Sequence, residues 1–265
     1  MKPFIFLAAL VSTNLWASDI LRDIPSAGIS SVQSEQTSYI LSSNAEFVAQ
    51  QKEMIEDKKL RLWGIALFSG ADLFSYGIKL ATANEWSHVG MILSDEAGQK
   101  YSYESTGSAE EILSQQVPPE VRISLWEKVV KEYDGKISTR EFQFSDATRN
   151  DPAVIQPYIY NRIGLPYEKK LGELVKAVIR ANKKADINSV FCSEEVAHFL
   201  IFLNYLTKDR LEDNYLPKDF SQKEFIPLVD CSLKKEVRVK TSKLRHPIIS
   251  VVFSSKLKIL KDQRA

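Results

Sequence analysis

The sequence predicts an α+β fold with an antiparallel sheet and a helix that starts at a cysteine. Short apolar stretches of strand length are interleaved with helix-length stretches from residue 62 onward, a pattern typical of this class. The turn residues Asp95-Glu96-Ala97-Gly98 separate two strand-like stretches, which indicates a hairpin. Small and acidic residues follow Cys192 and precede an apolar run, which indicates that a helix begins there.

The composition is that of an ordinary globular protein, because the 265 residues are 44% hydrophobic and 26% charged. This length allows one large domain or two small ones. The net charge of +1 indicates neither a nucleic-acid-binding surface nor a strongly acidic protein. The only two cysteines, Cys192 and Cys231, make no disulfide framework. A single bridge between them is an alternative that would consume the Cys192 thiol.

The first 17 residues have the features of a secretory signal peptide. Met1 and Lys2 make a short basic start, residues 3–16 are apolar, and Ala17 before Ser18 resembles a small-residue cleavage site. The apolar run is too short to span a membrane, and no cysteine follows it to carry a lipoprotein anchor. The mature chain is therefore expected to start near Ser18 and to be periplasmic or secreted. An N-terminal anchor that stays attached is the alternative.

Residues 18–60 are predicted to form an N-terminal extension ahead of one main domain at 61–265. The stretch 26–44 is rich in serine, glutamine, glycine and threonine, which indicates a loosely ordered lead-in. A helix is expected from about residue 44 to residue 61, because apolar side chains recur on one of its faces.

The main domain is expected to open with a strand, one or two helical turns and a hairpin. These lie at 62–68, 75–83, 86–93 and 99–106. Further elements follow in the second half of the domain. They are a strand at 121–125, a helix at 125–132, a strand at 137–144, a helix at 152–162, a basic helix at 169–186, a helix from 192 to 206, and late strands at 237–239 and 248–253. The lysine-rich tail beyond them is expected to be solvated.

The hairpin brings a histidine close to a carboxylate. Pairing Asp95 with Gln99 across the turn places Gly90 opposite Glu104, with His88 as a diagonal neighbour on the same face. A register shifted by two residues places His88 directly opposite Glu104. In both registers a carboxylate lies where it can orient the imidazole and stabilise its charged form, as a general base requires. A surface pair without chemistry is the alternative.

The start of a helix favours a reactive cysteine at position 192. Unpaired N–H groups and the positive end of the helix dipole stabilise a thiolate, which is the nucleophilic form of cysteine. An inert, buried Cys192 is the alternative. No cysteine or histidine pair has the spacing of a metal site, so no metal is expected. His198 lies six positions after Cys192, off its helix face, and His246 has no evident partner.

Several segments resemble motifs of the permuted papain-like amidases, the YaeF/YiiX-like branch of the NlpC-like cysteine peptidase superfamily. The similar segments are Asp72–Phe74, Trp86–Met91, Tyr103–Ser105, Tyr133–Ile137, Gly164–Tyr167, Phe191–Glu194 and Leu216–Phe220. Their common order and spacing, over about residues 62–225, make the set specific although no single motif is decisive. The chain departs from the family in its long segment 18–60 and in Glu168, where the family pattern has aspartate.

The resemblance implies a circularly permuted papain-like core, in which an antiparallel sheet packs against the Cys-bearing helix, and a catalytic domain at 61–265. It implies an exported cysteine hydrolase that cleaves an amide bond through Cys192, His88 and Glu104, with a thioester intermediate and no cofactor. A peptide or peptidoglycan fragment is the expected substrate. Tyr167 and Trp86 are candidates to line the substrate site, although core packing accounts for both. The alternatives are a lipid acyltransferase or esterase with an acyl-lipid substrate on the same core, and a non-enzymatic binding module. Contact with a membrane has no specific support.

Overall fold

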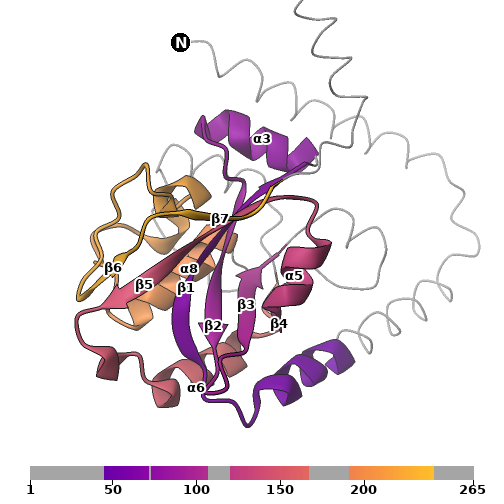
Figure 1. Cartoon of the computed structure of the whole chain (residues 1–265), viewed down its shortest axis with the longest axis vertical. Coiled ribbons are helices and arrows are strands. Elements are labelled where there is room, and N and C mark those ends of the chain that lie inside the picture. The colour runs from indigo at the N-terminus through magenta and orange to yellow at the C-terminus, as the bar shows by residue number, and fades with distance from the viewer. Residues whose placement is uncertain (1–44, 72, 107–119, 167–190, 242–265) are drawn as a thin grey trace, which may run out of the picture.

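The computed structural model describes residues 45–71, 73–106, 120–166 and 191–241, which form an antiparallel sheet with helices on both faces (Figure 1). The predicted α+β class is therefore confirmed. The strands are β1 (Arg61–Gly70), β2 (His88–Ser94), β3 (Lys100–Ser105), β4 (Val121–Leu125), β5 (Gly135–Phe144), β6 (Cys231–Leu233) and β7 (Val237–Lys240). The labelled α-helices are α3 (Leu73–Thr82), α5 (Trp126–Glu132), α6 (Pro152–Arg162) and α8 (Cys192–Phe202). Short 3₁₀ turns are η2 (Ala147–Arg149), η3 (Glu212–Asn214) and η4 (Pro217–Phe220), and residues 45–55 are also helical.

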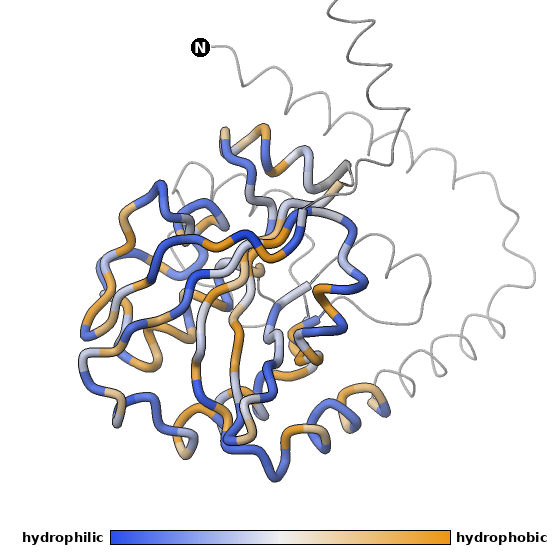
Figure 2. The backbone as a smooth tube through the Cα atoms, viewed as in Figure 1, coloured by the Kyte–Doolittle hydropathy of each residue, from blue (hydrophilic) through white to orange (hydrophobic). Residues whose placement is uncertain are grey.

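The strand order is β4-β3-β2-β1-β5-β6, and β7 pairs with the first part of β5. Each of these pairings is antiparallel. The central strands β1 and β2 are therefore hydrogen-bonded on both sides, and their burial follows from that position. In Figure 2 apolar stretches run along the middle of the sheet, while the helix at 45–55 shows both apolar and hydrophilic turns.

The hairpin turn sets the register of β2 and β3. Asp95 N–H donates to Gln99 O, Gly98 N–H donates to Asp95 O, and Asp95 Oδ1 also accepts from Gln99 N–H. Gly98 has a φ of 81°, a left-handed conformation that glycine adopts without strain. The resulting ladder pairs Met91 with Tyr103. The first of the two predicted registers is therefore the right one.

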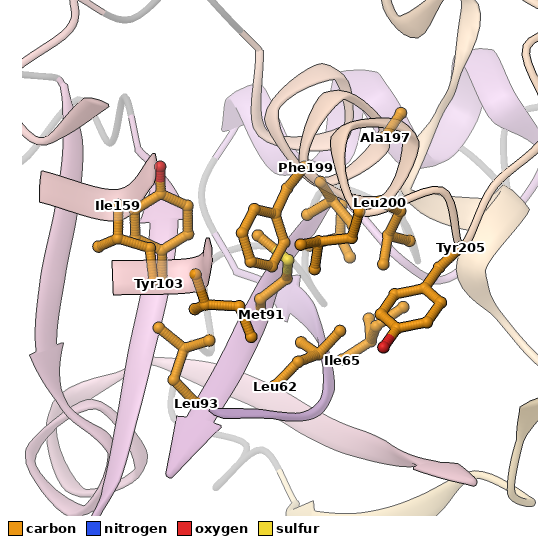
Figure 3. Close-up of a cluster of buried hydrophobic side chains, with 14 of the residues drawn as sticks. Leu62, Ile65, Met91, Leu93, Tyr103, Ile159, Ala197, Phe199, Leu200 and Tyr205 are labelled. Carbon is orange, nitrogen blue, oxygen red and sulfur yellow. The ribbon is translucent and has the colours of Figure 1, made fainter. Parts of the chain in front are cut away.

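The two faces of the sheet bury separate hydrophobic clusters. Helices α8 and α6 cover one face, and in Figure 3 Phe199 and Leu200 of α8 point toward Met91 and Ile65 of the sheet. The other face carries a smaller cluster beneath α5. Its members are Ala66, Phe68, Ile92, Trp126 and Ile137. Because side chains alternate along a strand, neighbouring residues of β2 serve different clusters.

Two predicted helix ends are wrong. The helix that starts at Cys192 ends at Phe202 and not at Leu206, because Asn204 takes a left-handed φ of 57° and the N–H groups of the next two residues both bond to Leu200 O. The helix of the extension ends at residue 55, and the chain from Arg61 joins the sheet. Asn150 holds that junction, since its side chain bonds both the N–H and the carbonyl of Leu62.

Strand β6 was not predicted, because three residues carry too weak a periodicity to indicate a strand. The predicted signal peptide, the basic helix at 169–186, the strand at 248–253 and the tail lie outside the described residues. Within the part of the chain that is described, no helix is both long and apolar enough to cross a membrane.

Candidate active site

His88 and Glu104 form a direct hydrogen bond and ion pair across the hairpin. His88 Nε2 lies 2.6 Å from Glu104 Oε2. The Glu104 side chain is 5% exposed, whereas that of His88 is 18% exposed. The carboxylate is thus fully enclosed, while one edge of the imidazole remains open to solvent.

Cys192 is the first residue of α8, and its thiol hydrogen-bonds the imidazole of His88. Since Nε2 of His88 is taken by Glu104, the nitrogen left for the thiol is Nδ1. The backbone N–H groups of Val89 and Ser193 also donate to the sulfur. The structure therefore brings together Cys192, His88 and Glu104, three residues that sequence analysis singled out.

The sulfur reaches an imidazole that belongs to the opposite face of the sheet. Val89 and Met91 pack in the cluster beneath α8, whereas the His88 ring packs on Phe68 of the other cluster, at 5.1 Å between ring centroids. The β2–β3 ladder extends only as far as the Met91–Tyr103 pair. Val89, whose N–H donates to the sulfur, lies beyond that pair. The helix start therefore meets the histidine beyond the end of the β2–β3 ladder.

The charges at this site favour a thiolate and an imidazolium. Burial alone would raise the pKa of Cys192, but the charge and hydrogen bond of His88, helped by the two backbone N–H groups, lower it below its ordinary value. Burial alone would lower the pKa of His88, but the charge and hydrogen bonds of Cys192 and Glu104 raise it to about 10. Each group thus stabilises the charged form of the other.

Glu104 stays ionised although it is buried. Burial raises the pKa of its carboxyl, but the hydrogen bond and charge of His88 outweigh that effect and lower it. Arg122, directly opposite Glu104 on β4, adds a positive charge. Ser102 Oγ donates to Glu104 Oε1 at 3.4 Å, a long and therefore weak hydrogen bond. Both oxygens of the Glu104 carboxylate therefore have a hydrogen-bond partner.

The start of α8 has few free donors. Phe191 N–H donates to Glu194 Oε2 at 3.0 Å, and Ser193 N–H donates to the Cys192 sulfur. Cys192 N–H lies in the first turn, where helix geometry provides no backbone acceptor. It is a donor at this terminus that a bound oxygen atom can use. Burial raises the pKa of Glu194 to about 8 in spite of the bond from Phe191.

A second buried polar cluster ties α8 to α6 and β3, and sequence reasoning missed it. Arg162 Nε lies 2.9 Å from both carboxylate oxygens of Glu195. Tyr103 and Tyr158 donate to Glu195 Oε1 at 2.6 and 3.2 Å. Glu195 is acidic within an apolar helix, which is a sequence signal that could have indicated a buried partner. His198 Nδ1 lies 2.6 Å from the Tyr158 oxygen, which can accept from it while the Tyr158 hydroxyl donates to Glu195.

The remaining candidates are a buried tryptophan, the second cysteine and two residues outside the described part of the chain. Trp86 is 2% exposed and belongs to the core cluster beneath α8, with the Arg238 guanidinium over its ring. Its expected role in lining a substrate site stays a prediction, and Tyr167 and His246 lie outside the described residues. Cys231 is a free thiol, which excludes the alternative of a bridge to Cys192. In the described ranges no three histidine, cysteine or acidic residues are grouped as metal ligands are.

Comparison with known proteins yields few matches. No protein-family model matches the chain, and no curated protein matches it. Solved structures do match, among them the metalloprotein YiiX from Escherichia coli O157:H7. That chain is 16% identical, the alignment covers 69% of this chain and 97% of YiiX, and the TM-score is 0.39. A likeness this loose carries no argument about fold details or activity, so the function has to be inferred from the site.

Proposed function

We propose that this protein is a cysteine hydrolase that cleaves an amide bond through Cys192, His88 and Glu104. One observation carries the proposal: sulfur, imidazole and carboxylate form one continuous hydrogen-bonded chain. This is the nucleophile, base and orienting group that covalent catalysis requires. A binding module has no need of a thiolate beside an imidazolium, so the arrangement favours catalysis over the non-enzymatic alternative.

The proposed reaction has two steps. The Cys192 thiolate attacks the carbonyl carbon, a C–S bond forms, and the electron pair of the C=O bond moves to oxygen. That pair returns as the C–N bond breaks, the amine leaves with a proton from His88 Nδ1, and a thioester remains. Water then attacks the thioester and gives a proton to His88, and the C–S bond breaks to restore the thiolate.

The start of α8 supplies stabilisation for the oxyanion in this proposal. The N–H of Cys192 and the positive end of the helix dipole would both stabilise the negative charge that develops on the substrate's carbonyl oxygen next to the sulfur. Glu104 does not take a proton. It holds the imidazolium that must exist when the tetrahedral intermediate forms, as its short bond to Nε2 supports.

The proposal includes a circularly permuted papain-like core. The chain order supports it, because the hairpin with His88 and Glu104 precedes the helix that starts at Cys192. It also includes export to the periplasm or the medium, which rests on the apolar N-terminal stretch of the sequence. A fragment of cell-wall peptide is then the substrate class to test first.

The test is hydrolysis by the purified full chain of two substrate series, peptide amides including peptidoglycan stem peptides, and acyl esters. The Cys192→Ala variant should lose activity by at least about 1000-fold. The Cys231→Ala variant is the matched control and should keep it, since Cys231 lies on β6 away from the triad. An acyl-thioester on the wild-type chain, seen by mass spectrometry as added substrate mass, is expected during turnover.

The results of these assays distinguish the hydrolase from the acyltransferase and from the binding module. Amide cleavage that needs Cys192 supports the proposal, and transfer of acyl groups from lipid esters in place of hydrolysis replaces it with the acyltransferase alternative. Cleavage that survives Cys192→Ala contradicts the mechanism. Absence of any turnover or acyl-enzyme across both series, with an unreactive Cys192 thiol, favours the binding module.

A further inference from the structure

Gly90 lies where the Glu104 side chain crosses from β3 to His88. The register places Gly90 opposite Glu104, while His88 is two residues earlier on the same face of β2. Glu104 must therefore reach its partner diagonally, over the position of residue 90. A side chain on that residue would occupy the path that the carboxylate follows.

The geometry shows how little space is available. A Cβ atom built on Gly90 would lie 3.0 Å from Glu104 Cβ, 3.2 Å from Tyr103 O and 3.7 Å from Glu104 Oε2. Contacts near 3.0 Å force the neighbour to move by a few tenths of an ångström. Oε2, which bonds His88 at 2.6 Å, would lie in ordinary van der Waals contact with this Cβ, so the hydrogen bond is disturbed through the shift of Glu104 Cβ, which carries the carboxylate with it.

Backbone conformation does not account for the glycine. Gly90 lies inside a regular strand and is absent from the positive-φ glycines of the described chain. Glycine inside a strand weakens it, because it offers no side chain to pack and loses more conformational freedom. The close approach of the opposite strand requires it, and Glu104 Cβ at 3.0 Å is nearer than Tyr103 O at 3.2 Å.

We propose that Gly90 is a positioning residue, whose missing side chain leaves the space through which Glu104 bonds and orients His88. This inference rests on the proposed function, because orientation of His88 has a purpose only if the histidine serves Cys192. Gly90 touches neither sulfur nor substrate in this proposal, and it acts only through Glu104.

The test measures the pKa of His88 in the full chain by NMR of the imidazole Cε1–H. The chain has three histidines, so loss of one resonance in a His88→Ala variant assigns the signal. The Gly90→Ala variant should lower the pKa of His88 by about one unit or more, since the carboxylate that stabilises the imidazolium is displaced. Gly77→Ala is the matched control and should leave it unchanged, because a Cβ there meets nothing within 4 Å.

Coupling to Glu104 distinguishes positioning from a general structural role. Glu104→Gln should lower the pKa of His88 as well, and adding Gly90→Ala to it should cause no further shift. Fully additive shifts, or a Gly90→Ala variant that titrates like the wild type, would overturn the inference. A wild-type His88 that titrates near its ordinary value of 6.5 would instead overturn the proposed function.

A double variant that exchanges the glycine between the two strands keeps the test decisive if Gly90→Ala does not fold. If Gly90→Ala does not fold by circular dichroism, Gly90→Ala combined with Glu104→Gly moves the missing side chain to the opposite strand and restores the space. Folding of the swap, with a lowered pKa of His88, supports the proposal because the conflict is then with Glu104. An unfolded swap shows that the strand itself needs Gly90 and contradicts it.

Discussion

The hydroxyl of Tyr103 donates to Oε1 of Glu195 over 2.6 Å, which joins β3, the strand that also carries Glu104, to the helix that starts at Cys192. Both ends of this bond are buried. It connects α8 to the strand that pairs with β2, the strand of His88. The bonds around Glu195 thus hold α8 against β3, and none of them involves Cys192, His88 or Glu104.

We expect Tyr103→Phe to destabilise the fold by about 1–3 kcal/mol, because it leaves a buried carboxylate oxygen with one donor fewer. Urea denaturation of the purified chain measures this free energy of unfolding. Tyr76→Phe is the control, since Tyr76 is 37% exposed, and it should change stability by less than about 0.5 kcal/mol. Equal losses in the two variants would contradict a specific role for the Tyr103 hydroxyl.

Arg162→Met should cost about 3–5 kcal/mol, because it leaves the charge of Glu195 buried without its partner. The Glu195 side chain is 1% exposed, so water cannot replace the guanidinium. Combining Arg162→Met with Glu195→Leu should regain a large part of the loss, since no charge is then left unpaired. Thermal unfolding of the single and double variants measures both effects.

The control for this pair is Arg149→Met. Arg149 also bonds an acidic residue, Asp230, but on the surface, where the pair is worth only about 0–1 kcal/mol. Equal losses of stability in Arg162→Met and Arg149→Met would show that the Glu195 carboxylate does not depend on Arg162, in spite of the short distances between them.

The two thiols should react at different pH. The charge and bond of His88 outweigh burial and lower the pKa of Cys192, whereas burial raises the pKa of Cys231 to about 11. A lowered pKa means that the thiolate persists as the pH falls. Iodoacetamide at about pH 6 should therefore alkylate Cys192 more than about 100-fold faster than Cys231, as followed by peptide mass spectrometry.

His88→Ala is the informative variant for that measurement. Without the imidazolium, burial is opposed only by the two backbone N–H groups, so the pKa of Cys192 rises and its alkylation should shift to alkaline pH. The rate for Cys231 should not change. A Cys192 that reacts equally fast at pH 6 without His88 is incompatible with the ion pair.

The local parts of the structure were predictable from sequence. The Asp95–Gly98 turn fixes a register through its own hydrogen bonds, and β4 spans Val121–Leu125 as predicted. Asp151 caps α6 through a bond from Ala153 N–H, and Pro152 opens that helix. Turn and capping interactions form between residues a few positions apart, so the local sequence is enough to predict them.

Features that depend on distant partners were not predictable. Beyond the end of α8 at Phe202, Asn204 takes a left-handed conformation and the chain after it pairs with Leu228 and Val229, more than 20 residues later. Strand β6 exists because β5 offers it an edge, and the cluster around Glu195 needs residues from three elements. Tertiary packing overrides weak local preferences in each case.

The sequence by itself determined which groups can do chemistry here: a cysteine at a helix start, and a histidine diagonal to a glutamate on a short hairpin. Only the tertiary structure decided that they meet. The β2–β3 ladder stops at the Met91–Tyr103 pair, and the start of α8 meets His88 beyond that pair. The physical reason is that strand alternation and turn chemistry are local, whereas the approach of a helix about 90 residues further along the chain is set by burial of the core it packs on.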